Sequence, residues 1–477
     1  MKKILFVFSV TLLALSCSKD FGDTNVDTKK PAVVPPGALF ANAQKNLVDI
    51  MTSTNVNNNI FRMLAQQWTE TTYIDEANYD LGTRNIPQNF WNTLYTGVLS
   101  NLKETQRLIP SQNDAFFPAA VKANQNACAE ILNVYAYATL VNTFGDVPYT
   151  ESLDYTKVYP VYDDAAGIYT DLLTRLNKAL ADINVSAGGF DGSDLLYGGD
   201  MAGWKTFGTS LKLRLGMILA DSNPATAKST VEAAAAGIVA DNADNVVFHY
   251  LSSPPNTNPV WADLIQSGRK DFVAANTLVD FMKNLSDPRV PAYFTTDAAG
   301  GYSGGIYAAN NNFVTYSKPS SGLTAPDFGS VLFDAAEGHF LLAEAAERGM
   351  NVGGTAAEHY EAGIRASIAF WGGSSADADA YLANANVAYA TAPGDWKTKI
   401  GNQAWIALYN RGFDAWTEWR RLDAPTLNVP EGLTYGDIPV RYTYPVQEQN
   451  LNIENYNRAS SAIGGDAVTV KIFWDKN

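Results

Sequence analysis

Hydrophobic residues recur every three or four positions along most of the chain, which is the spacing of one face of an α-helix. In residues 88–109, for example, Phe90, Leu94, Val98 and Leu102 follow this spacing. The same pattern predicts a series of helices over much of the chain. They are expected at residues 88–109, 119–144, 165–183, 204–220, 225–240, 276–285, 334–348, 356–371 and 396–409.

Patterns typical of β-strands are rare by comparison. Residues 245–248 and 467–473 are short runs rich in β-branched residues, and they predict two strands. Long stretches without helical spacing separate the helices at residues 70–87, 249–275 and 291–329. Loops of this length are often functional in compact domains. The sequence therefore predicts a mainly α fold with long loops and small β elements.

Small residues at helical spacing indicate close packing between two of the predicted helices. Residues 340–349 are rich in alanine, and the next helix carries Ala356, Tyr360, Gly363 and Ile364. Small residues followed by an aromatic suit tetratricopeptide (TPR) helix pairs, which must approach closely to stack. Because a 34-residue period does not recur cleanly, we expect TPR-like pairs within a larger body.

The N-terminus has the pattern of a secreted lipoprotein. Lys2 and Lys3 precede the apolar residues 4–15, a run too short to span a bilayer as a helix and typical of a signal peptide. Cys17 follows almost directly and is the predicted site of lipidation. An ordinary signal peptide with an incidental cysteine is the alternative. The expected division is a signal peptide at 1–16, a lipidated N-terminus and tether at 17–37, and the folded body at 38–477.

The charge of the chain narrows the choice of partners. The formal net charge is −15, and removal of residues 1–16 takes away two lysines and moves it to −17. An acidic surface repels the phosphate backbone, so we expect no nucleic-acid partner.

Chemistry-bearing motifs are sparse. The chain has no HExxH, no P-loop and no GxGxxG motif, and it holds three histidines and two cysteines. Cys128 lies in an apolar helix and is expected to pack in the core. Asp377 and Asp379 have the spacing of calcium ligands, but no EF-hand loop follows, so a helix cap is favoured. We therefore expect no metal and no cofactor.

Carboxylates are plentiful, so a surface-anchored glycoside hydrolase is an alternative reading. Glu70, Asp75, Glu76 and Asp80 share one predicted loop. No pair among them is singled out by environments that would push its two pKa values apart. We therefore expect a protein that is not an enzyme.

Five stretches resemble the SusD/RagB family, and in particular its second large subgroup of nutrient-binding lipoproteins. They include the GDVPY turn after a long helix, the YGGD motif and the DPR motif, and they occur in the order of the family. The stretches are residues 133–152, 194–214, 287–294, 405–421 and 441–456.

This resemblance implies a SusD-like single domain, mainly α, with TPR-like pairs as its scaffold. It implies a lipid-anchored protein of the outer membrane that faces the outside. Such a protein captures oligosaccharides, or sometimes peptides, and passes them to a SusC-like TonB-dependent transporter.

Ligand-binding residues are expected among the loop aromatics. Exposed rings pack on the apolar faces of sugars, while nearby amides, carboxylates and cations bond to hydroxyl groups. Some of these rings could instead pack beneath their own loops, and a TPR-type adaptor without a small ligand is a further alternative. The candidate residues are Trp68, Tyr73, Tyr79, Asp80, Arg84, Trp261, Tyr302, Tyr307 and Asn311.

Overall fold

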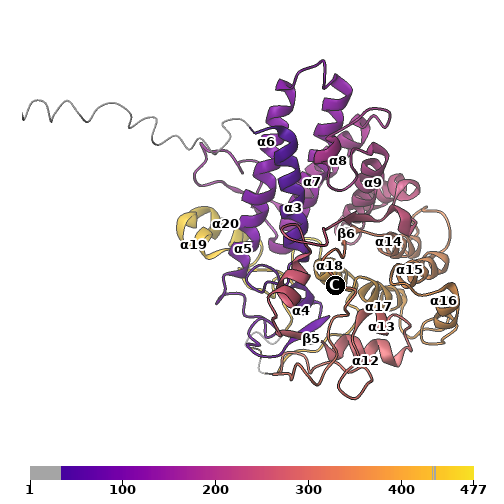
Figure 1. Cartoon of the computed structure of the whole chain (residues 1–477). Coiled ribbons are helices and arrows are strands. Elements are labelled where there is room, and N and C mark those ends of the chain that lie inside the picture. The colour runs from indigo at the N-terminus through magenta and orange to yellow at the C-terminus, as the bar shows by residue number, and fades with distance from the viewer. Residues whose placement is uncertain (1–33, 432, 434–436, 477) are drawn as a thin grey trace, which may run out of the picture.

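Helices dominate the computed structural model, which describes residues 34–431, 433 and 437–476. In Figure 1 the long helices of the first half of the chain stand side by side, and the helices of residues 335–422 gather beside them. The first half contains α3 (Pro36–Thr52), α4 (Phe61–Leu64), α5 (Ile86–Asn92), η1 (Thr93–Leu99), α6 (Ser100–Leu108), η2 (Ile109–Ser111), α7 (Ala119–Phe144), α8 (Ala165–Asp182), η3 (Asp191–Ser193), α9 (Met201–Ile218), α10 (Pro224–Ala234) and η4 (Ala235–Gly237).

The second half adds shorter helices and a helical C-terminal region. It contains η5 (Asn242–Asp244), α11 (Pro259–Trp261), η6 (Ala262–Gln266), α12 (Asn276–Asn284), α13 (Val290–Tyr293), α14 (Ala335–Glu347), α15 (Ala356–Phe370), α16 (Ser375–Leu382), α17 (Trp396–Ala407), α18 (Gly412–Leu422), α19 (Val446–Leu451) and α20 (Ile453–Ala462). No helix among the described residues is long and apolar enough to cross a membrane.

Three two-stranded antiparallel sheets join distant parts of the chain. The pairs are β1 (Trp68–Glu70) with β5 (Phe272–Ala274), β2 (Val147–Pro148) with β3 (Tyr162–Asp163), and β4 (Val246–Phe248) with β6 (Ser330–Phe333). The strand predicted at 245–248 is confirmed as β4. The strand predicted at 467–473 is wrong, because this segment pairs with no strand and instead buries Ile472 beside a C-terminal tryptophan.

The helical periodicity locates the long helices well. The helix predicted at 119–144 is confirmed at both ends, and Gly145 follows it with φ of 88°, a conformation that glycine adopts without strain. The helix predicted at 88–109 is continuous but contains the π-helical segment η1. Thr93 and Thr96 donate their hydroxyls to carbonyls four residues earlier, which competes with the regular backbone bonds of this helix.

The predicted tether extends too far into the body. Its last two residues, Pro36 and Gly37, begin α3, since a proline fits the first helical turn, where its missing N–H is not needed. Residues 1–33 lie outside the described residues, and so do the predicted signal peptide and Cys17. Cys128 is buried as expected, and burial raises the pKa of its thiol well above the ordinary value.

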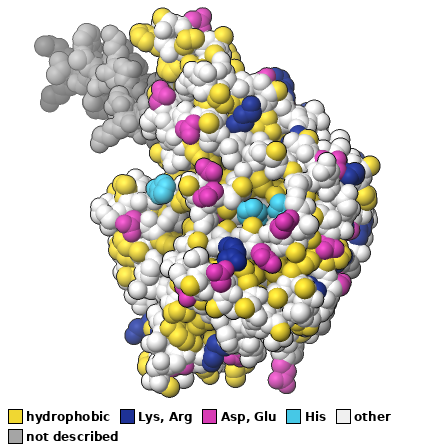
Figure 2. Space-filling model, turned by 90° about the vertical axis from the view of Figure 1, so that its right-hand side faces the viewer, with side chains coloured by type: hydrophobic (Ala, Val, Ile, Leu, Met, Phe, Trp, Pro, Cys, Tyr) yellow, Lys and Arg dark blue, Asp and Glu magenta, His cyan; other side chains and the backbone are white. Residues whose placement is uncertain are grey.

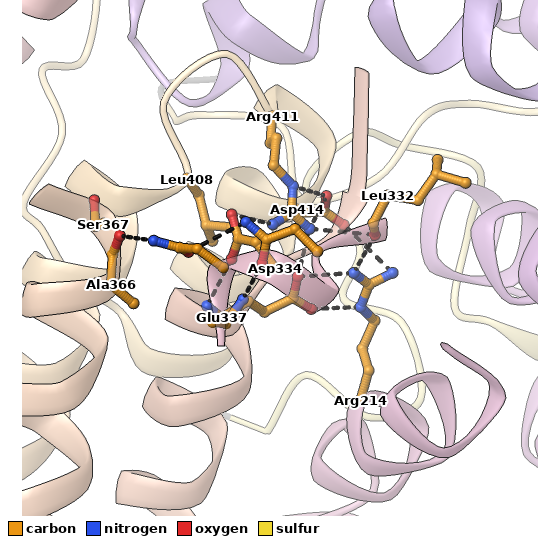
Figure 3. A network of polar contacts seen from close by, with 12 residues as sticks. Arg214, Leu332, Asp334, Glu337, Ala366, Ser367, Leu408, Arg411 and Asp414 are labelled. Atoms are coloured by element: carbon orange, nitrogen blue, oxygen red, sulfur yellow. Dashed lines mark hydrogen bonds and ion pairs between the residues drawn. The ribbon is translucent and has the colours of Figure 1, made fainter. Parts of the chain in front are cut away.

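A network of buried charges joins α9, α14 and α18 at the centre of the molecule (Figure 3). Arg214 on α9 donates to Glu337 on α14, with 2.8 Å between Nη2 and Oε2. Arg411 donates to the same carboxylate and to Asp414, with 3.0 Å from its Nε to Oδ2. These side chains are almost fully buried, so each charge depends on its partners for stabilisation.

The segment around α4 is bound to the C-terminal part of the chain. Arg62 donates to Asn410 at 2.9 Å, and Gln67 donates to the carbonyl of Leu408 at 2.9 Å. In the opposite direction, the indole N–H of Trp405 on α17 donates to the carbonyl of Ala65 at 2.8 Å. The partners in these three bonds are separated by 340 to 348 positions in the sequence.

Candidate functional site

An open groove of about 410 Å³ lies between α3 and the segment 254–266. We call it the α3 groove. Its lining is rich in neutral polar groups, because α3 ends in an asparagine-rich turn and the opposite wall is the start of α11 and η6. Asn46, Asn55, Asn58 and Gln266 supply carboxamides. Carboxamides both donate and accept hydrogen bonds, as a ligand with many hydroxyl groups requires.

One pair of charged groups in the α3 groove is neutralised from within, whereas Asp263 forms no ion pair with another described residue. Lys45 forms an ion pair with Asp49 one turn further along α3. Tyr250 donates its hydroxyl to Asp49 at 3.0 Å, and the ammonium of Lys45 lies 5.6 Å from the ring centre of Tyr250. Burial raises the pKa of Asp49 despite these contacts. Asp263 accepts a hydrogen bond from Thr54 at 2.8 Å.

Not all carboxamides of the groove are held by the protein. Asn46 donates to the carbonyl of Gly97 at 3.1 Å, which fixes its position on α3. The side chains of Asn58 and Gln266 make no hydrogen bond to other described residues, so their polar atoms are open to a ligand. Trp261 is half-buried at the end of α11 and does not line the groove itself, although the next residue, Ala262, does.

Beside the groove lies the loop of residues 71–85. Its most exposed aromatic is Tyr73, at 76 % exposure, and the backbone of Tyr73 has a positive φ of 58°. A bulky residue in this conformation is held there by its surroundings and often marks a functional loop. Two hydrogen bonds hold the loop at its start, where the hydroxyl of Thr71 donates to the carbonyl of Lys270 and its backbone N–H to the carbonyl of Asp271.

Two buried carboxyl groups lie under the 71–85 loop. Glu70 accepts a hydrogen bond from the backbone N–H of Ala77 at 2.9 Å, and Glu76 pairs with Arg84. Burial, reinforced by the charges of Glu76 and Asp75, raises the pKa of Glu70 to about 9. Burial therefore favours the neutral form of Glu70 at neutral pH.

The loop is linked by hydrogen bonds to the elements on either side of the groove. Asn89 on α5 donates both to the carbonyl of Asn57, in the turn after α3, and to the carbonyl of Arg84, at 2.9 Å and 3.3 Å. At the other edge, residues 267–271 connect η6 to β5 and contact the start of the loop.

Four of the nine candidate residues are buried, and the expectation that they are exposed is wrong. Trp68 is 1 % exposed and donates its indole N–H to the hydroxyl of Tyr409 at 3.0 Å. Tyr79 and Tyr307 pack with their ring centres 6.2 Å apart. Asn311 donates to the carbonyl of Glu70 at 2.9 Å. Tyr307 and Asn311 hold the 71–85 loop against the long loop that follows α13 and ends at residue 329.

The other five candidates reach the surface in different ways. Tyr73 is exposed, while Trp261 and Tyr302 are half-buried. Asp80 accepts hydrogen bonds from the backbone of its own turn, including that of Gly82, which lowers its pKa although burial opposes this. Arg84 is engaged by Glu76. Sequence reasoning missed the α3 groove itself, although the asparagines at 55, 57, 58 and 59 were a signal for a polar surface.

Comparisons with known proteins agree on one fold. Residues 28–445 match the model of the SusD-like family that is described as starch-binding and associating with the outer membrane. No curated protein matches by sequence.

Solved structures show the same relationship. A chitin-binding protein superposes with a TM-score of 0.80 at 26% identity, over 93% of this chain and 100% of its own. A chitin-binding SusD homologue from Flavobacterium johnsoniae gives 0.79 at 26%, over 93% and 99%. A SusD homologue from Bacteroides uniformis gives 0.78 at 25%, over 92% and 99%.

Proposed function

Because this chain belongs to the SusD-like family, we propose that it captures oligosaccharides at the cell surface and delivers them to a SusC-like TonB-dependent transporter. In this proposal Cys17 carries the lipid that holds the protein on the outer membrane, facing the outside. The protein acts by binding and not by catalysis. The structural similarity to chitin-binding proteins favours glycans over peptides as the ligand.

The observation that carries the proposal is the chemistry of the α3 groove. Neutral carboxamides line an open hollow of about 410 Å³, the ammonium of Lys45 is paired with Asp49, and Ala262, which follows Trp261 in the sequence, is part of the wall. A neutral sugar offers hydroxyl groups and an apolar ring face, and it carries no charge that would need an ionic partner. In this proposal the exposed ring of Tyr73 extends the contact to a second ring of the sugar chain.

Glycan binding can be measured by titration calorimetry with chitooligosaccharides, maltooligosaccharides and a peptide of similar length. We expect micromolar to millimolar affinity for one glycan class, which is about −4 to −8 kcal/mol. The double variant Asn58→Ala with Gln266→Ala should weaken binding about tenfold or more. Asn351→Ala is the matched control, because this exposed carboxamide lies away from the groove. Unchanged affinity in the double variant would remove the groove from the proposal.

The glycoside hydrolase reading is not favoured by the positions of its carboxylates. Glu70 and Glu76 are 3 % and 1 % exposed and contact each other, while Asp80 is bound to its own turn. The test is incubation of the protein with the glycan it binds. Appearance of new reducing ends at a rate above that of a heat-treated sample would overturn the binding-only proposal.

An exposed apolar surface supports docking on a membrane barrel. Contiguous patches of exposed hydrophobic side chains commonly mark interfaces with other proteins or with membranes. The helices α19 and α20 stand at the edge of the molecule in Figure 1, and Asn455 on α20 donates to the carbonyl of Tyr159 at 3.0 Å. The exposed side chains gathered here are Tyr155, Val158, Tyr159, Val446, Leu451 and Ile453.

The barrel partnership can be tested from mild detergent extracts with a tag at the C-terminus. We expect a TonB-dependent barrel encoded beside this gene to be recovered in near-equal amount. The double variant Tyr159→Asp with Leu451→Asp should reduce that recovery, whereas Val185→Asp, at another exposed apolar position, should not. Recovery of the wild-type protein alone, with the barrel present in the extract, would contradict the partnership.

A further inference from the structure

A second hollow of about 240 Å³ lies between α12, the segment 386–393 and α17. We call it the amide pocket. No element that lines the α3 groove also lines this pocket. Its volume is below the roughly 300–1,000 Å³ of sites that enclose a drug-sized ligand. It therefore has the size for one end of a longer molecule.

Carboxamides from three separate elements meet in the amide pocket. Asn284 comes from α12, Asn386 from the loop before α17, and Asn402 from α17. Their side chains make no hydrogen bond to other residues of the described chain. Gln403 differs, because the hydroxyl of Tyr381 holds it at 3.1 Å. A carboxamide has a carbonyl and an N–H₂ group in one plane, so it can bond to both sides of a peptide group.

The charge of the amide pocket is unusual for this protein. Lys399 is the one charged residue in its lining, although the chain as a whole carries −15. Its ammonium donates to the carbonyl of Tyr389 at 2.9 Å and lies 5.4 Å from the centre of that ring. A lysine has three N–H donors, so this contact positions the ammonium and leaves donors for a ligand.

The surroundings of the pocket are acidic, so the preference for a negative group depends on Lys399 in its lining. Figure 2 shows the side of the molecule that carries α15 and α16, where acidic side chains are scattered over the surface. An anion that reaches the pocket meets a local cation without a carboxylate in the lining. The remaining wall is apolar, formed by Phe281, Leu285 and the ring of Tyr360. Tyr360 is fixed by its hydroxyl, which donates to the carbonyl of Val387 at 2.7 Å.

We propose that the amide pocket binds the carboxyl-terminal end of a peptide chain. Lys399 pairs with the terminal carboxylate, the asparagine carboxamides bond to the last peptide group, and the apolar wall accepts the last side chain. Recognition of a chain end in this way uses few contacts, all of which the pocket supplies. A neutral sugar would use the carboxamides but would offer the ammonium of Lys399 no anionic partner. This inference does not depend on glycan capture in the α3 groove.

The experiment uses the full mature chain and a short alanine-rich peptide that ends in leucine, labelled with a dye at its N-terminus. Fluorescence anisotropy compares the peptide with a free carboxylate and the same peptide with a C-terminal amide. We expect the free acid to bind at least tenfold more tightly than the amide. Lys399→Met should remove this preference, and Lys399→Arg should restore part of it.

Two further variants separate the pocket from the general charge of α17. Lys397→Met removes a lysine two positions away that does not line the pocket, so its binding should match the wild type. Asn402→Ala should weaken binding of both peptide forms. It provides an independent test of the pocket if Lys399→Met lowers the thermal midpoint of the protein. Equal affinity for acid and amide, or no binding of either, would overturn the proposal. Binding of galacturonate without binding of the peptide would overturn it as well.

Discussion

Trp68 and Tyr73 lie five positions apart, yet one ring is in the core and the other is in solvent. The indole of Trp68 has the guanidinium of Arg62 over its face at 4.9 Å and Tyr409 at its N–H. Tyr73 projects from the loop with most of its surface exposed. The buried ring of Trp68 stabilises the fold, whereas the exposed ring of Tyr73 is available to a ligand. Truncation of Trp68 should therefore lower stability, and truncation of Tyr73 should weaken ligand binding.

The first prediction concerns these two residues. Trp68→Ala should lower the free energy of unfolding by about 3–5 kcal/mol, because it leaves a cavity and removes a hydrogen bond. Tyr73→Ala should change it by less than about 0.5 kcal/mol and should weaken glycan binding. Urea unfolding and calorimetric titration of both variants measure the two effects. A stable Trp68→Ala protein would mean that the indole is not part of the core.

A second prediction at this scale concerns the proton on Glu70. Its pKa of about 9 lies above the ordinary 4.5, so folding favours the protonated form. The resulting stabilisation is complete below pH 4.5 and is lost as the pH rises through 9. Glu70→Gln cannot ionise, so its unfolding free energy should fall less between about pH 5 and pH 9 than that of the wild type.

Urea unfolding at several pH values measures this difference. Asp75→Asn is the control, because Asp75 is exposed and acts on Glu70 only as a distant charge. Its effect on the pH dependence should be smaller. Parallel curves for the wild type and Glu70→Gln would show that the proton contributes nothing to stability.

At the scale of elements, hydrophobic periodicity could locate some of the helices and strands but not others. The helix at 119–144 could be predicted because its apolar residues repeat over seven turns. The helix α3 could not, because its start lies in a proline-rich stretch that reads as a tether. The β-like run at 467–473 failed for another reason, since a strand needs a partner and the sequence does not show one.

The candidate site, like the secondary structure, could be predicted only in part from the sequence. Loop composition indicated the region of Tyr73 and Arg84, but it could not separate exposed rings from buried ones. The α3 groove depends on α3 meeting η6 across more than 200 positions, and local sequence carries no information about that contact. Long loops must bury some of their own aromatics, and the tertiary partners decide which ones.

The prediction at the scale of elements concerns the buried charge network that joins α9, α14 and α18. Glu337→Ala removes the carboxylate between Arg214 and Arg411 and leaves both guanidinium groups under-compensated in the core. The loss of unfolding free energy should be about 3–5 kcal/mol. Glu361→Ala, at an exposed position on the neighbouring α15, should cost less than about 0.5 kcal/mol. Similar denaturation midpoints for the two variants would contradict a structural role for the network.

For the whole molecule, attachment to the membrane determines where binding takes place. Confinement of the protein and a barrel to one membrane raises their effective concentration, so a moderate interface would be largely occupied. The acidic net charge of −15 favours a partner with basic or polar groups at its rim.

The corresponding prediction concerns Cys17. Cys17→Ala should leave the protein without fatty acid and move it from the membrane fraction to the soluble fraction, since stable anchoring requires acyl chains. Metabolic labelling with a radioactive fatty acid and fractionation measure this. Cys128→Ala is the control and should remain lipidated, because Cys128 is buried in the body. Continued labelling of the Cys17→Ala protein would place the lipid elsewhere.

The bonds between α4 and the residues around Trp405 have a consequence for the order of folding. A chain that crosses a membrane from its N-terminus presents Arg62, Ala65 and Gln67 about 340 positions before their partners. Contacts of such long sequence separation form slowly, because a large loop must close before they contribute. In the proposed export, the region of α4 would therefore stay open until its partners emerge, and its apolar residues would be exposed to aggregation. A chain cut before Trp405 should remain in that state, with Trp68 accessible to solvent, however complete its N-terminal helices are.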